Sequence, residues 1–147
     1  MTTIAWDGKS VAADSQCTYG SYISPVNYRK LIKRDGIVFA CTGSGPLFSP
    51  LVDWYLSGHD PKSCPTATGD YTSTLLVFRD GKAFMLKTEM PYPEEMHAPD
   101  AWGAGAEFAI GAMHAGADAS RAVEIAIKCN PYTGGEVLCF ELETPRP

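Results

Sequence analysis

Short runs of apolar or alternating residues, separated by Asp-Gly pairs, dominate the first ninety positions of the chain. An Asp-Gly pair between two such runs is the strongest short-range signal of a β-hairpin. The pairs lie at 7–8, 35–36 and 80–81, and the pattern predicts six strands in three hairpins, over 3–6 with 10–13, 28–34 with 37–41, and 74–78 with 83–86. A further extended stretch is expected from Tyr19 to Ile23.

Apolar residues recur at helical spacing in three other places. Residues 46–57 predict a short helix, and residues 106–115 predict a second one that is rich in Ala and Gly. Asp118 is suited to cap the N-terminus of a third helix. Because only Gly116-Ala117 separates the second helix from this cap, we expect the last two helices to be antiparallel neighbours.

The remaining segments complete a mixed pattern of hairpins and helices. The segments 59–69 and 89–99 are rich in proline and predict loops, and 136–142 alternates like a strand. The resulting order is ββ, ββ, α, ββ, αα, β. Hairpins with helices segregated from them favour an α+β fold in which helices cover sheets. A length of 147 residues is typical of one domain, spanning 1–147.

Charge and composition exclude several classes of function. Twelve basic against seventeen acidic residues give a net charge of −5, with no basic cluster, so we expect no nucleic-acid partner. No apolar run reaches the length of a membrane span and no leader-like segment opens the sequence, which favours a cytoplasmic protein. The five cysteines form no Cys-x-x-Cys pair and the three histidines are isolated, so we expect reduced thiols and neither metal nor cofactor.

Seven short segments carry a resemblance that spans the chain. They are Thr2–Ala5, Val11–Gln16, Gly20–Ile23, Arg29–Leu31, Cys41–Gly45, Gly103–Gly105 and Asn130–Gly135. Their order, and the interval of 16 residues between Asp14 and Lys30, resemble the proteasome β-subunit and HslV-type peptidases, a family of N-terminal nucleophile (Ntn) hydrolases. The resemblance implies a four-layer αββα sandwich, reduced in size because the helix after 46–57 is lost or shortened into the 59–69 loop.

Thr2 carries the chemistry that this resemblance implies. Once Met1 is removed, Thr2 offers a hydroxyl nucleophile and an α-amine with a reference pKa of about 7.7–8.0, which can serve as its general base. The resemblance assigns Lys30 to lowering the pKa values of the amine and the hydroxyl, and Asp14 to holding Lys30 in place. The N–H of Gly43 is the candidate oxyanion donor, with Cys41 and Ser44 as alternatives.

The same resemblance implies a substrate and an assembly. A peptide or unfolded protein would lie extended along Cys17 and Thr18 and along the 41–45 segment, which includes Thr42, through main-chain hydrogen bonds. A homo-oligomeric ring is implied, with an ATPase as a further partner. The predicted activity is hydrolysis of peptide bonds by a threonine peptidase.

Two residues near the expected site depart from the family pattern. Ala104 stands where the family has a serine that hydrogen-bonds to the terminal amine, and Asn130 replaces an aspartate at the start of the turn that continues with Thr133 and Gly134. The missing hydroxyl leaves two alternatives open: a non-catalytic scaffold protein of the same fold, and an Ntn amidohydrolase that acts on a small amide. A retained Met1 would block Thr2 in any of these proteins.

Overall fold

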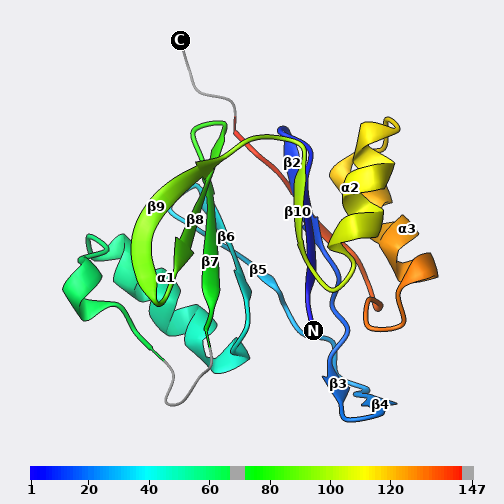
Figure 1. Ribbon diagram of the computed structural model, residues 1–147, viewed down its shortest axis with the longest axis horizontal. Helices are drawn as coiled ribbons and strands as arrows, with labels where there is room; N and C mark the ends of the chain where they lie inside the picture. Colours follow the sequence, from blue (N-terminus) through cyan, green and yellow to red (C-terminus); the bar gives the residue numbers. More distant parts are fainter. Residues whose placement is uncertain (67–71, 144–147) are drawn as a thin grey trace.

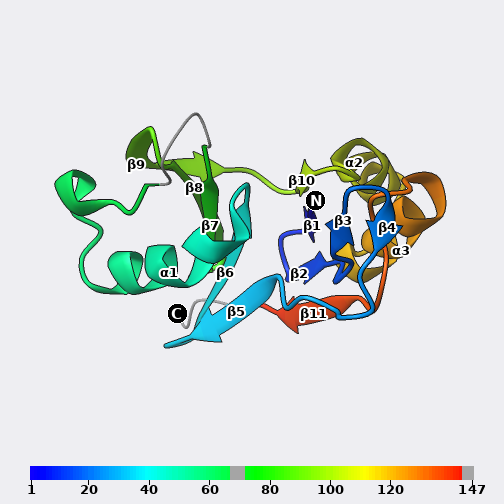
Figure 2. The ribbon, with the colours of Figure 1, turned by 90° about the horizontal axis from the view of Figure 1, so that it is seen from below.

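Two antiparallel sheets lie face to face, and helices cover the outer face of each (Figures 1 and 2). The computed structural model describes residues 1–66 and 72–143. One sheet has the order β10-β1-β2-β11, with β1 (Thr3–Trp6), β2 (Ser10–Ala13), β10 (Asp100–Gly103) and β11 (Leu138–Glu141). The other has the order β5-β6-β7-β8-β9, with β5 (Leu31–Arg34), β6 (Ile37–Thr42), β7 (Thr74–Arg79), β8 (Lys82–Lys87) and β9 (Met90–Met96).

The helices complete four layers. Helix α1 (Phe48–Leu56), preceded by a 3-10 turn at Gly45–Leu47, packs against the five-stranded sheet. Helices α2 (Ala106–His114) and α3 (Ala119–Cys129) pack as a pair against the four-stranded sheet. The expected αββα sandwich is confirmed, and in the described residues one outer layer is reduced to α1, its preceding 3-10 turn and a second 3-10 turn, Pro61–Ser63.

The alternation of strand side chains creates the separate apolar layers. Ile4 and Trp6 of β1 face the opposite sheet, where they join a cluster that includes Phe78. Ala5, between them, faces α2 and α3 and packs in a cluster rich in alanine. Small side chains on this face let the two helices approach the sheet closely.

All three predicted hairpins are confirmed. Asp35-Gly36 and Asp80-Gly81 adopt positive φ at both positions, as a two-residue type I′ turn requires. The first hairpin uses a different turn, in which the carboxylate of Asp7 accepts the N–H groups of Lys9 (2.8 Å) and Ser10 (2.7 Å).

The prediction of a loop over 89–99 was wrong. Residues 90–96 form β9, the edge strand of the five-stranded sheet, and residues 100–103 form β10, which had not been predicted. Proline cannot donate to a ladder, but an edge strand leaves one side unpaired, so Pro91 and Pro93 are tolerated there. The local composition therefore suggested a loop where the sheet supplies a strand.

Smaller differences concern the ends of elements. The strand expected from Tyr28 begins only at Leu31, and the closing strand is confined to β11. The stretch 19–23 forms a small hairpin of β3 (Thr18–Tyr19) and β4 (Tyr22–Ile23). Part of the expected 59–69 loop, residues 67–69, lies outside the described residues.

The three helices agree with their predicted positions. Asp118 caps α3, because its side chain accepts the N–H of Arg121 at 2.8 Å. None of the helices in the described part of the chain is both long and apolar enough to cross a membrane.

Candidate active site

Asp14 and Lys30 form a buried ion pair close to the N-terminus. Asp14 directly follows β2 and Lys30 directly precedes β5, so each sheet supplies one partner. The Nζ of Lys30 lies 2.9 Å from Oδ1 of Asp14, and the two residues are only 8% and 1% exposed. The same carboxylate accepts the backbone N–H of Thr3 (3.0 Å) on Oδ1 and that of Gly134 (3.1 Å) on Oδ2. Four segments of the chain therefore meet at one carboxylate.

The ammonium group of Lys30 also contacts the peptide bond in front of Thr2. Its Nζ donates to the carbonyl oxygen of Met1 at 2.7 Å. The carbonyl oxygen of Thr2 itself accepts the N–H of Ala104 at 2.8 Å. Thr2 is thus held on one side by Ala104, the residue that follows β10, and the ammonium group of Lys30 lies beside the peptide bond between Met1 and Thr2.

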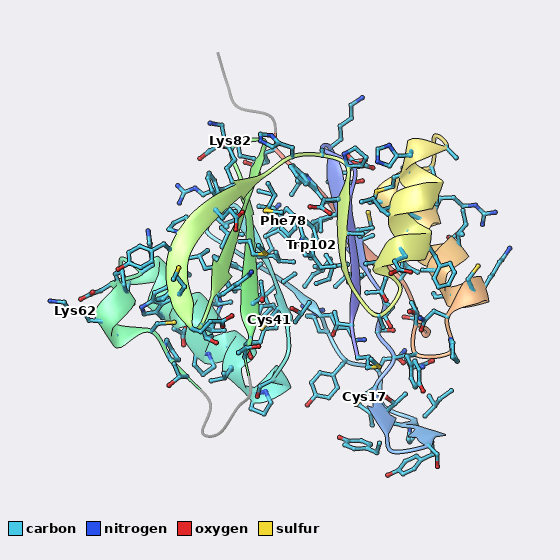
Figure 3. All side chains as sticks on the ribbon, in the orientation of Figure 1. Cys17, Cys41, Lys62, Phe78, Lys82 and Trp102 are labelled. Atoms are coloured by element: carbon cyan, nitrogen blue, oxygen red, sulfur yellow. The ribbon has the colours of Figure 1, made fainter. Side chains whose placement is uncertain are left out.

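A cavity of about 390 Å³ opens beside Thr2. Of the residues predicted from the sequence, Thr2, Cys17, Lys30, Cys41 and Gly43 line it. Thr18, Thr42 and Ser44, predicted to bind substrate, are not among its lining residues. The side chains of Cys17, before β3, and Cys41, at the end of β6, are labelled in Figure 3.

A larger cavity, of about 540 Å³, lies at the other end of the sheets, beside the turns at Asp35 and Asp80. None of the predicted site residues lines it. Size alone therefore does not identify the site, whereas the cavity at Thr2 combines a hydroxyl, a buried ion pair and a glycine turn.

Gly43, the first residue of the turn after β6, has no room for a side chain. Gly43 has φ +103°, and a Cβ atom there would lie 2.5 Å from the carbonyl oxygen of Thr72. The N–H of Ser44, the alternative oxyanion donor, is already used in a 3.0 Å hydrogen bond to Oγ of Ser73. Burial raises the pKa of the Cys41 thiol to about 12, so this thiol stays protonated at neutral pH and is a poor nucleophile.

Thr3 is a site residue that the sequence pattern did not reveal. It is fully buried, and its Oγ1 shares a 2.8 Å hydrogen bond with Oγ1 of Thr133 and accepts the N–H of Gly105 at 2.9 Å. The chain is also tightly packed at Gly134, the residue after Thr133, where a Cβ atom would overlap the amide oxygen of Gln16. A signal for Thr3 was available, because a hydroxyl at the start of a buried strand needs a partner.

The two departures from the family pattern lie next to each other. The side-chain Nδ2 of Asn130 donates to the carbonyl oxygen of Ala104 at 2.9 Å. No group of three or more His, Cys, Asp or Glu residues suited to a metal ion occurs within residues 1–66 and 72–143.

The fold is shared with solved structures of other proteins. HslV from Trypanosoma brucei matches with 20% identity and a TM-score of 0.73, covering 97% of this chain and 99% of that one. Thiobacillus denitrificans BPH matches with 22% identity and a TM-score of 0.70, covering 97% and 98%. The same protein in complex with epoxomicin matches with 20% identity and a TM-score of 0.69, over the same shares.

These matches confirm the resemblance at the level of the fold. The chain adopts the HslV-type fold over nearly its whole length. Neither a family model nor a curated protein sequence matches the chain.

Proposed function

We propose that this protein is a threonine peptidase whose nucleophile is Thr2, exposed by removal of Met1. The observation that carries the proposal is the buried Lys30–Asp14 pair, whose ammonium group lies 2.7 Å from the carbonyl oxygen of Met1. A cation at this place lies beside the hydroxyl and the amine that Thr2 offers after Met1 has gone.

The proposed reaction proceeds through an ester. The free α-amine of Thr2 takes the hydroxyl proton while Oγ1 attacks the carbonyl carbon of the substrate. The N–H of Gly43 stabilises the oxyanion, and Lys30 favours the deprotonated states of the amine and the hydroxyl. The peptide C–N bond breaks, the leaving amine takes the proton, and water then hydrolyses the ester to free Thr2.

The lining of the cavity supports an apolar side chain at the cleavage position. Tyr19, Tyr28 and Phe48 contribute aromatic rings, and among residues 1–66 and 72–143 no Asp or Glu lines the cavity. Within the described part of the chain, the cationic groups that line it are those of Lys30 and Arg29. We therefore expect neutral apolar residues to be preferred over basic ones, because a basic side chain would meet two cations.

The buried ion pair argues against the scaffold alternative. Desolvating two charges costs more than their attraction returns unless the geometry is excellent, so a protein that needed only the fold gains little from the pair. Ala104 is the observation that favours a scaffold, because it lacks the hydroxyl expected beside the amine. The other alternative, an Ntn amidohydrolase that acts on a small amide, differs from a peptidase only in its substrate. A comparison of peptide and small-amide substrates would therefore distinguish the two.

We further propose that the protein acts as a homo-oligomeric ring in the cytoplasm, with an ATPase as partner. The support for this is the fold shared with HslV. Enclosure of the site would keep a peptidase from attacking folded proteins.

The proposal is tested by assaying the hydrolysis of a fluorogenic peptide. The assay uses protein whose intact mass shows that Met1 has been removed. Thr2→Ala should abolish turnover with an unchanged melting temperature, and Thr2→Ser should retain part of it because serine keeps hydroxyl and amine. Epoxomicin, which is present in the BPH complex, should add its mass to the trimmed chain but not to Thr2→Ala. An alanine variant as active as the parent protein would remove Thr2 from the mechanism, and a chain that uniformly retains Met1 would favour the scaffold.

A further inference from the structure

We infer that Asn130 is a positioning residue for Thr2, that it acts through the backbone of Ala104, and that an amide is required there. The inference rests on the proposed function. Both ends of the Asn130 side chain are used: Nδ2 donates to the carbonyl oxygen of Ala104 (2.9 Å), and Oδ1 accepts the N–H of Tyr132 (2.7 Å). Only this orientation of the amide satisfies both partners.

The backbone at Ala104 transmits this contact to the N-terminal strand. The N–H of Ala104 donates to the carbonyl oxygen of Thr2 at 2.8 Å. The peptide group that follows accepts Asn130 on its oxygen and donates its N–H, that of Gly105, to Oγ1 of Thr3 at 2.9 Å. Asn130 therefore orients a peptide group that holds the residue next to the nucleophile.

The surrounding packing leaves this segment little freedom. A Cβ atom at Gly103 would overlap the carbonyl oxygen of Thr2, and one at Gly105 would lie 2.8 Å from Oγ1 of Thr3. With backbones in such close contact, a rotation of the 104–105 peptide must displace Thr2 as well. A displacement of about 1 Å in a reacting group can lower a rate by about 10²-fold.

A carboxylate cannot replace the amide. In Asn130→Asp the ionised side chain is acceptor-only, so one of its oxygens would face the carbonyl oxygen of Ala104 without a proton between them. When the introduced carboxyl is protonated, it has one O–H donor and one acceptor and can make both hydrogen bonds. Hydrogen bonding to the neutral form raises the pKa of a carboxyl, which moves this protonation toward the range in which activity can be measured.

The pH dependence of Asn130→Asp relative to the parent protein is the distinguishing measurement. For Met1-trimmed proteins, we expect kcat of the variant to be about one tenth of the parent value at pH 8, with KM unchanged because Asn130 does not line the cavity. The ratio should rise at least threefold by pH 5. Titration of the other groups on the elements that meet here cancels in the ratio, since both proteins carry Asp14, Lys30, Glu107, Lys128, Cys129 and Tyr132.

Two further variants separate positioning from charge and from folding. Asn27→Asp adds the same charge at an exposed residue whose amide oxygen lies close to Gly135. For this control, the ratio of its kcat to that of the parent protein should stay near one at each pH. Asn130→Ala loses both hydrogen bonds at every pH, so its kcat should fall without recovery at pH 5. A loss of stability alone would lower the melting temperature but would not give a pH-dependent kcat ratio.

Amide hydrogen exchange at Ala104 and Gly105 tests the inference without using activity. At pH 8, exchange should be about tenfold faster in Asn130→Asp than in the parent protein, and the difference should shrink at pH 5. Unchanged exchange, or a kcat ratio independent of pH, would overturn the inference even if the parent protein is an active peptidase. A parent protein that hydrolyses no peptide would instead overturn the proposed function, while the exchange data would still decide the role of Asn130.

Discussion

The ammonium group of Lys30 lies 2.9 Å from the carboxylate of Asp14, and both residues are almost completely buried. The partners come from different sheets, so the pair joins the two inner layers of the sandwich at the end where the N-terminus lies. Removing one member of such a pair leaves a buried charge without compensation. The pair should therefore matter for folding and for catalysis, and the two effects must be measured separately.

Lys30→Ala should lower kcat/KM of the trimmed chain by about 10²–10⁴-fold, the usual range for assistance in proton transfer. It should also destabilise the protein by about 3–5 kcal/mol, because Asp14 loses its cation. Steady-state kinetics well below the melting temperature isolates the first effect. The matched control is Lys33→Ala, at an exposed position of β5, which should change neither quantity. Equal effects of the two substitutions would reduce Lys30 to a structural charge.

Ala104→Ser should raise turnover of a fluorogenic peptide more than fivefold in Met1-trimmed protein, which corresponds to roughly 1 kcal/mol of barrier. The introduced hydroxyl would supply a hydrogen-bond partner for the Thr2 amine. Residue 104 is partly exposed, whereas neither Gly103 nor Gly105 has room for a Cβ atom. The same substitution in Met1-retaining protein should have no effect, since the Thr2 amine is blocked. A parent protein that is already fast, with a serine variant no faster, would show that another group fulfils this role.

Gly103→Ala should abolish activity and destabilise the chain, because its Cβ atom would overlap the carbonyl oxygen of Thr2 and φ at this position is +96°. Gly111→Ala is the matched control. Gly111 lies inside α2 and a Cβ atom there meets nothing within 4 Å, so alanine should stabilise the protein by up to about 1 kcal/mol. Thermal unfolding and peptide hydrolysis check both variants, and a fully active Gly103→Ala would show that the contact of β10 with Thr2 is dispensable.

Asp7 should make stability depend on pH. Burial by itself would raise the pKa of the Asp7 carboxyl, but backbone N–H donors, with Ser10 first among them, outweigh it and hold the pKa below its usual 3.8. One of these donors is the N–H of Ala119 in the first turn of α3, at 2.8 Å, so the carboxylate ties the first hairpin to a helix N-terminus.

Because the pKa is lower in the folded state, the stabilisation by Asp7 is present above about pH 4 and is lost as the pH falls through the folded-state value. Asp7→Asn should therefore be less stable than the parent protein by about 1 kcal/mol at pH 7, and the difference should shrink as the pH falls below about 4. Urea unfolding at several pH values measures this. Asp35→Asn, the control, changes the corresponding residue of another Asp-Gly turn. Its free energy of unfolding should differ from that of the parent protein by a small amount that does not change with pH. If the stability difference between Asp7→Asn and the parent protein were also independent of pH, the predicted dependence of stability on the ionisation of Asp7 would be ruled out.

The sequence by itself was sufficient for the elements whose causes are local. The Asp-Gly pairs at 35–36 and 80–81 set two hairpins because positive φ at adjacent positions suits few other residue pairs. The side chain of Asp7 set the first hairpin by accepting N–H groups within its own turn. Asp118 set the start of α3 because a cap acts within one turn. The order of short motifs also identified the fold, and the proximity that it predicted for Thr2, Asp14 and Lys30 agrees with the contacts of Lys30. These are properties of neighbouring residues, or of a pattern that the chain shares with a known fold.

Only the tertiary structure decided the features that depend on contacts between distant segments. Met90–Met96 is a strand because β8 offers it an edge, although its prolines favour a loop. The role of Thr3 depends on Gly105 and Thr133, which lie 102 and 130 residues away along the chain. Hydrogen bonds of this kind leave no periodic signal in the sequence, because the partners are chosen by how the two sheets and the helices pack.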